Sequence, residues 1–164
     1  GLKILSNKQL KCSSKSRKHL LKKHLDPTPR LKESHLLTRS TCKITSMIDI
    51  SDGLAQDLQH ICRQSKTGAL IYEKNLPQSQ AFSKVCSENN WEALPLILNG
   101  GEDYELLFTI KPEDVKKIKS LFLKADTFVS RIGEITKSPK KITLIKKNGS
   151  KVSLKPATGF NHFK

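Results

Sequence analysis

A short run of carboxylates and a hydroxyl in the middle of the chain has the donor types of a magnesium site. Residues 49–53 read Asp-Ile-Ser-Asp-Gly. In an extended strand alternate side chains share a face, so Asp49 and Ser51 point the same way, and a turn after them lets Asp52 reach the same space. Mg²⁺ binds few carboxylates and completes its coordination with water and phosphate oxygens. The alternative is structural: Ser51 or Asp52 caps a helix that begins near Leu54.

A second acidic cluster follows a pair of glycines. Residues 99–105 read Asn-Gly-Gly-Glu-Asp-Tyr-Glu. Paired glycines permit backbone conformations and close approaches that other residues do not. Three carboxylates within four residues repel one another unless a cation or solvent compensates them. Two interpretations stay open, namely a site linked to a metal or a substrate, and an acidic turn that leads into a buried strand. The chain has neither a Walker loop nor a Rossmann fingerprint.

Both clusters lie where a predicted strand meets a turn. Residues 47–50 read as a short strand that ends in the first cluster. Apolar residues then recur at helical spacing from Leu54 to Cys62, which predicts a helix directly after it. Residues 104–110 are a second apolar run, and we expect a strand that starts at the second cluster.

The rest of the chain mixes helical and strand patterns. Pro27 and Pro29 predict an extended connector, because proline disfavours helix at its own position and at the one before it. Asn148-Gly149 predicts a β-hairpin turn. We expect a helical segment over 1–25, with a hydrophilic break at 13–18. Further helices are expected over 31–37, 79–87 and 91–98 and from 111 onward. Strands are expected over 69–72, 127–135, 142–145 and 152–154. This mixture favours a layered α+β domain.

The charge is unevenly distributed. The formal net charge is +15, which divides into +10 for residues 1–46, −5 for 47–110 and +10 for 111–164. A basic protein can bind nucleic acid by displacing counterions from phosphates. However, the first 46 residues hold no aromatic side chain on which bases could stack. A solvated lysine-rich surface is therefore the favoured interpretation of the flanks, and both acidic clusters lie in the acidic middle.

Cysteine spacing and hydropathy exclude several classes of protein. Cys12, Cys42, Cys62 and Cys86 form no Cys-x-x-Cys pair and stand at no zinc-finger spacing, so a structural metal site is not expected. No apolar run approaches the roughly 18 residues of a transmembrane helix. Residues 1–21 carry lysines every few positions, unlike a signal peptide. We expect reduced thiols in a cytoplasmic protein that does not enter a membrane.

Several motifs in the same order resemble the C-terminal domain of bacterial thiamine-monophosphate kinase. The first is Met-Ile-Asp-Ile-Ser-Asp-Gly-Leu at 47–54, and the second is Gly-Gly-Glu-Asp-Tyr-Glu-Leu-Leu-Phe-Thr at 100–109. The run Ile-Gly-Glu-Ile at 132–135 and the closing Gly-Phe-Asn-His-Phe at 159–163 are similar to later landmarks of that family. Upstream, His24, Pro27, Pro29 and Arg30 resemble the connector before that domain. The resemblance covers about residues 20–164.

The resemblance implies a fold and an activity. The fold would be α+β, a three-layer α/β/α domain with a mixed sheet that is partly ferredoxin-like, as in the aminoimidazole ribonucleotide synthetase superfamily. The activity would be transfer of the γ-phosphoryl group of ATP to thiamine monophosphate, which gives thiamine diphosphate and requires Mg²⁺. Phosphoryl transfer depends mostly on positioning and on charge neutralisation by metal, which fits an acidic centre in a basic chain.

The resemblance also implies roles for individual residues. Asp49 and Asp52 would be magnesium ligands, and Ser51 would contact ATP. Glu102 would bind the thiamine substrate, and Phe160 would pack against it. No residue is assigned to catalysis itself. The chain departs from the family at Asn161, where an aspartate is common.

The resemblance further implies that this chain is part of a longer protein. Residues 1–25 would be a linker or the remnant of an absent N-terminal ATP-binding domain, and residues 26–164 the C-terminal kinase domain. We expect the piece to be inactive alone and the full-length enzyme to be a homodimer. Two alternatives stay open: a basic nucleic-acid-binding module, and a non-catalytic remnant domain of the same superfamily.

Overall fold

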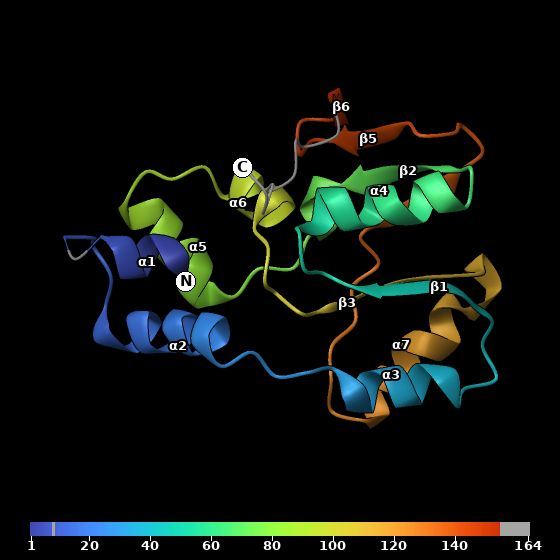
Figure 1. Ribbon diagram of the computed structural model, residues 1–164, viewed down its shortest axis with the longest axis horizontal. Coiled ribbons are helices and arrows are strands. Elements are labelled where there is room, and N and C mark those ends of the chain that lie inside the picture. The colour runs from blue at the N-terminus through green and yellow to red at the C-terminus, as the bar shows by residue number, and fades with distance from the viewer. Residues whose placement is uncertain (8, 155–164) are drawn as a thin grey trace, which may run out of the picture.

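A computed structural model describes residues 1–7 and 9–154. Short helices and short strands are mixed along the chain, with three helices at its start and three strands at the end of the described part (Figure 1). In chain order the elements are α1 (Leu2–Ser6), α2 (Ser14–Leu25), α3 (Leu31–Thr38), β1 (Ile44–Asp49), α4 (Leu54–Gln64), β2 (Gly68–Tyr72), a 3₁₀ turn (Glu73–Asn75), α5 (Gln80–Glu88), α6 (Ala93–Asn99), β3 (Leu106–Ile110), a second 3₁₀ turn (Pro112–Asp114), α7 (Val115–Lys124), β4 (Gly133–Thr136), β5 (Ile142–Ile145) and β6 (Lys151–Leu154).

The strands form two separate sheets. Strands β1 and β3 make an antiparallel pair in which Asp49 lies opposite Leu106. The other sheet has the order β4-β2-β5-β6 and is mixed, because β2 runs parallel to β5 while the remaining pairs are antiparallel. Strands β5 and β6 form the hairpin that Asn148-Gly149 predicts.

Helix α4 lies between the two sheets, as Figure 1 shows. Its apolar face follows the predicted stripe, and Leu58 and Cys62 are buried with Ile71 and Leu144 of the four-stranded sheet. Each large aliphatic side chain buried in this way contributes about 1.5–3 kcal/mol. The other side of the β1–β3 pair carries a smaller core, whose buried members are Leu37 of α3 and Ile118 and Phe122 of α7.

The α+β class and the mixed sheet are confirmed. Helices α3 and α7, the β1–β3 pair and α4 form three α/β/α layers, and the four-stranded sheet adds a fourth layer beyond α4. Helices α1 and α2 lie beside α5 at the other end of Figure 1, with Ile4 buried. The proposed boundary at residue 26 stays a prediction.

Two local predictions were wrong. The break within 1–25 lies between Ser6 and Ser14 rather than at 13–18. Ser13 caps α2 by accepting a hydrogen bond from the Ser16 amide, and lysine and arginine are good helix formers. The strand predicted over 127–135 is limited to β4, because pairing with β2 begins only at Gly133. In the part of the chain that the structure describes, no helix has the length and apolar character needed to cross a bilayer.

Candidate functional site

The two acidic clusters lie side by side because their backbones are hydrogen-bonded to each other. The Ile50 amide donates to the Glu105 carbonyl at 2.9 Å, and the Tyr104 amide donates to the Ile50 carbonyl at 2.9 Å. The Glu102 amide donates to the Ser51 carbonyl at 2.8 Å. These bonds continue the β1–β3 pairing beyond the ends of both strands. Clusters that are about fifty residues apart in the sequence therefore form one surface.

Glycines permit this close approach. A Cβ atom on Gly101 would lie 2.5 Å from the Ser51 carbonyl oxygen, inside van der Waals contact. Gly53 has φ +113°, a conformation that L-residues rarely adopt, and a Cβ there would lie 3.0 Å from the Asn99 carbonyl carbon. A larger residue at 101 would thus push the two loops apart.

A buried carboxylate accepts hydrogen bonds from the backbone of the first cluster. Asp57, in the first turn of α4, is 2% exposed. Its Oδ2 accepts hydrogen bonds from the Ser51 amide at 3.0 Å and from the Asp52 amide at 3.1 Å. The helix itself begins after Gly53 without a side-chain cap, so neither Ser51 nor Asp52 serves as the cap that the structural alternative required. Both of these side chains are exposed.

The first cluster offers oxygen and nitrogen donors on one side of α4. Donor atoms of Asp52, Asp57 and His60 all lie within 4.8 Å of one another. Asp49 is exposed at the end of β1 but is not a member of this group. The two carboxylates are of the type that Mg²⁺ binds, because it takes carboxylate oxygens and leaves room for water and phosphate oxygens, whereas the His60 nitrogen is not a donor that Mg²⁺ favours. Sequence patterns assign no role to Asp57 or His60, although an acid on the apolar face of a helix is a signal that can single out Asp57.

The second cluster has an unusual backbone. Glu102 and Tyr104 have φ of 62° and 50°, in the left-handed region that side chains disfavour. The Glu102 carboxylate lies 3.8 Å from Nδ1 of His24 on α2. Desolvation raises the pKa of Asp103, and the charge of Glu105 raises it further. We call residues 102–105 the acidic loop. Phe160, the other residue expected at the substrate, lies outside the described residues.

Comparisons with known proteins identify the family. The family model of AIR synthase related protein, C-terminal domain, matches residues 2–146. The chain belongs to this family. Its α+β fold is therefore that of an AIR synthase related protein, C-terminal domain.

The curated relatives include several named thiamine-monophosphate kinase. The one from Buchnera aphidicola subsp. Schizaphis graminum is 39% identical over 166 residues, which cover 99% of this chain and 48% of the relative. The one from Escherichia coli K12 is 42% identical over 110 residues, which cover 67% of this chain and 32% of the relative. The chain thus spans about half the length, or less, of these curated relatives.

Solved structures share the fold. AaThiL complexed with AMPPCP and TMP has a TM-score of 0.75 at 25% identity, covering 99% of this chain and 46% of that one. The thiamine-monophosphate kinase of Stenotrophomonas maltophilia has a TM-score of 0.77 at 27% identity, covering 87% and 45%. The hydrogenase maturation protein HypE of E. coli has a TM-score of 0.64 at 17% identity over 79% of this chain and 39% of that one, which shows the fold alone.

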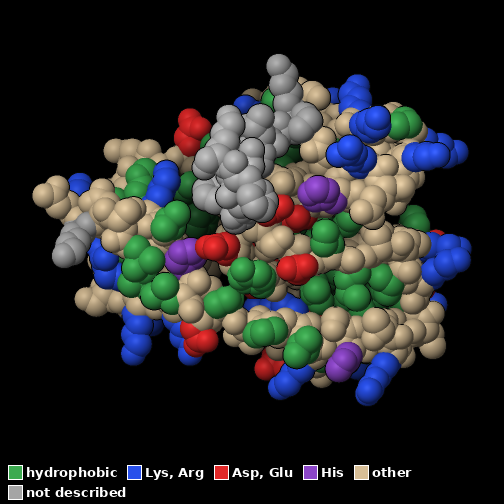
Figure 2. Space-filling model, viewed as in Figure 1, with side chains coloured by type: hydrophobic (Ala, Val, Ile, Leu, Met, Phe, Trp, Pro, Cys, Tyr) green, Lys and Arg blue, Asp and Glu red, His purple; other side chains and the backbone are tan. Residues whose placement is uncertain are grey.

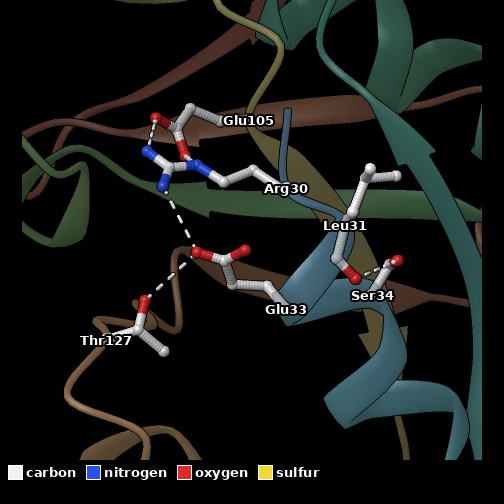
Figure 3. A network of polar contacts seen from close by, with 6 residues as sticks. All are labelled: Arg30, Leu31, Glu33, Ser34, Glu105 and Thr127. Atoms are coloured by element: carbon white, nitrogen blue, oxygen red, sulfur yellow. Dashed lines mark hydrogen bonds and ion pairs between the residues drawn. The ribbon is translucent and has the colours of Figure 1, made fainter. Parts of the chain in front are cut away.

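In this AIR synthase related domain, an arginine joins the connector before α3 to the acidic loop (Figure 3). Arg30 donates from Nε and Nη2 to the two carboxylate oxygens of Glu105, at 2.8 and 2.6 Å. Its Nη1 donates to Glu33 Oε1 at 3.2 Å, and Thr127 Oγ1 donates to the same oxygen at 3.5 Å. The hydrogen bond to Glu105 is the main reason that the pKa of Arg30 is raised.

The surface of the domain follows the charge pattern of its sequence. Figure 2 shows acidic side chains gathered toward the middle of one face, with Lys and Arg mostly at its margin. Asp49, Ser51, Asp52 and Glu102, all singled out from the sequence, are exposed. The structure brings the segments that carry them together, because residues 50–51 pair with 102–105.

Proposed function

We propose that this chain is the C-terminal half of a thiamine-monophosphate kinase. The reaction is transfer of the γ-phosphoryl group of ATP to thiamine monophosphate, which gives thiamine diphosphate. The names of the curated relatives support this reaction, as does the similarity to AaThiL complexed with AMPPCP and TMP. The coverage of about half of each relative supports the proposal that an N-terminal half completes the enzyme.

The observation that carries the proposal is the joining of the two acidic clusters. Three backbone hydrogen bonds of 2.8–2.9 Å place the Asp-Ile-Ser-Asp run beside the Gly-Gly-Glu-Asp run. A kinase of this kind must hold a nucleotide and a phosphorylated acceptor next to each other, since phosphoryl transfer depends mostly on positioning. A surface built from two adjoining loops can assign one loop to each substrate.

Within this surface we propose the following roles. Asp49 and Asp52 hold Mg²⁺, which when bound neutralises charge on the phosphates. Ser51 lies between them in the sequence and contacts ATP. Glu102 binds thiamine monophosphate, and Phe160 packs against that substrate. Asp57 keeps the backbone of Ser51 and Asp52 in place through its two hydrogen bonds.

The proposal extends to the whole enzyme. The N-terminal domain supplies the remaining nucleotide contacts, and the full-length protein is a cytoplasmic homodimer. The chain alone is not expected to turn over, because the N-terminal domain would supply part of the site.

The test joins this chain to the N-terminal half of the E. coli relative and measures thiamine diphosphate formation from ATP and thiamine monophosphate. The joined protein should be active, and the 164-residue chain alone should be inactive. Asp52→Asn should lower kcat at least about 100-fold, because loss of even an outer-shell partner of a metal ligand costs about 10- to 100-fold. Asp126→Asn is the matched control, since Asp126 is exposed after α7 and has a φ of 50° that asparagine accepts.

Two results would overturn the proposal. Turnover by the chain alone would refute the requirement for a second half. A folded joined protein that does not phosphorylate thiamine monophosphate, even at saturating Mg²⁺, would refute the reaction.

A further inference from the structure

The acidic loop has a backbone that its own sequence does not favour. Glu102 and Tyr104 both have positive φ, at 62° and 50°, within a stretch of three residues. Neither is glycine, and such conformations persist only where surrounding contacts hold them. The conformation of the loop therefore has to be held by contacts with the surrounding structure.

Backbone hydrogen bonds supply the first set of fixed points. The amides of Glu102 and Tyr104 donate to the Ser51 and Ile50 carbonyls. These bonds hold the peptide groups, but they leave the carboxylates of the loop unrestrained. Three carboxylates at 102, 103 and 105 also repel one another, and the charge of Glu105 raises the pKa of Asp103.

Arg30 supplies the second fixed point, at the end of the loop where β3 begins. Its two bonds to the Glu105 carboxylate, from Nε at 2.8 Å and from Nη2 at 2.6 Å, form a bidentate pair. A bidentate pair fixes the direction of the carboxylate as well as its distance. The same guanidinium neutralises one of the three negative charges of the loop.

Arg30 is itself anchored away from the loop. Its third nitrogen contacts Glu33 of α3, which also accepts from Thr127 in the segment after α7. The side chains of Arg30 and Glu33 are 23% and 17% exposed, whereas that of Glu105 is 49% exposed. Figure 3 shows the guanidinium between the two carboxylates. The anchor therefore lies in the α3–α7 layer, and the loop is the part that it restrains.

We propose that Arg30 is a positioning residue for the phosphoryl acceptor. It acts through Glu105 by holding the acidic loop in its left-handed conformation, so that Glu102 is presented to the acceptor in one orientation. This inference rests on the proposed function, because it takes Glu102 as the residue that binds thiamine monophosphate. Lysine cannot replace Arg30, since a single ammonium group does not form the bidentate pair.

The first experiment measures amide hydrogen exchange in this chain by NMR. Arg30→Lys and Arg30→Ala should each speed exchange at the Glu102 and Tyr104 amides by about tenfold, the change expected when hydrogen bonds to a charged group are lost. Exchange at Leu58 and Ile61 of α4 should not change. Arg131→Ala is the matched control, because Arg131 also pairs with an exposed glutamate, Glu134, at 2.6 Å.

The second experiment uses the joined enzyme described above. Arg30→Lys should raise the KM for thiamine monophosphate about tenfold, while kcat and the KM for ATP stay within about twofold. A purely structural arginine would lower the fraction of folded enzyme and leave both KM values unchanged. Glu105→Gln should give the same selective rise, and adding it to Arg30→Lys should have little further effect.

The outcomes separate this inference from the proposed function. If amide exchange in the acidic loop does not change in the Arg30 variants, the inference about Arg30 is overturned, whatever the kinase activity of the joined enzyme. Faster exchange with an unchanged KM for thiamine monophosphate overturns the role toward the acceptor. If the wild-type joined enzyme shows no turnover, the proposed function fails, and the exchange data still decide whether Arg30 holds the loop. Glu105→Gln keeps the test valid if the Arg30 variants do not fold.

Discussion

The two halves of the site are held in place by opposite means. The loop of Ser51 and Asp52 is held from inside by a carboxylate that is 2% exposed. The acidic loop is held at the surface by Arg30, whose partner Glu105 is about half exposed. Buried hydrogen bonds are little affected by salt, whereas exposed ion pairs are screened and contribute less. We therefore expect the proposed nucleotide side to be rigid and the proposed acceptor side to be adjustable.

The largest expected effect comes from removing the internal support. Asp57→Ala leaves the Ser51 and Asp52 amides without their acceptor, and we expect it to lower the free energy of unfolding by about 3 kcal/mol. Urea denaturation followed by circular dichroism measures this change. Asp57→Asn is the control, because it keeps one acceptor oxygen and should lose about 1 kcal/mol. A loss below about 0.5 kcal/mol in Asp57→Ala would contradict the comparison.

A smaller effect is expected from salt. Raising NaCl from about 0.05 to about 0.5 M shortens the Debye length below 10 Å and should speed amide exchange in the acidic loop about two- to threefold. The Ser51 and Asp52 amides should exchange at the same rate at both salt concentrations. Equal acceleration at both loops would show that they are restrained in the same way.

The smallest effect is expected from pH at Asp103. Its pKa is raised by desolvation and then by Glu105, so its charged form is less favoured in the folded protein than in the unfolded one. The folded state therefore gains relative stability as pH falls through the raised pKa toward the unfolded value of 3.8. Asp103→Asn should raise the urea midpoint slightly at pH 7.

The same variant provides its own internal control. Well below pH 3.8 the aspartate is protonated in both states, and the difference between Asp103→Asn and the wild type should disappear. A difference that persists unchanged at low pH would mean that the substitution acts by packing rather than by charge.

Sequence patterns anticipated the segments of the site better than their arrangement. The strand, turn and helix around the first cluster follow directly from local residue types, as does the hairpin at Asn148-Gly149. The contact between the two clusters depends on pairing between β1 and β3, whose register no local periodicity encodes. Only the family resemblance draws attention to Arg30, because a single arginine in a connector carries no local sign of its partner.

Other features escaped prediction for physical reasons. Helix α4 carries an aspartate on its apolar face, but only the loop that folds over it explains why that charge can be buried. The division into two sheets was not expected, because it depends on which distant strands pair. For example, β2 pairs in parallel with β5, which lies more than seventy residues away in the sequence. The hydrophilicity of 13–18 wrongly predicts a break there, because Ser13 caps a helix at this point.

The backbone ladder that joins the two loops has a consequence for how such domains diversify. Because main-chain groups hold the segments at 50–51 and 102–105 together, the exposed side chains of Ser51 and Glu102 are not needed for that joining. Residues at these two positions can change without separating the two segments. A single fold can in this way acquire a new substrate while its hydrophobic cores stay intact. The substrates that it can accept are then limited by the side chains at these positions rather than by the stability of the fold.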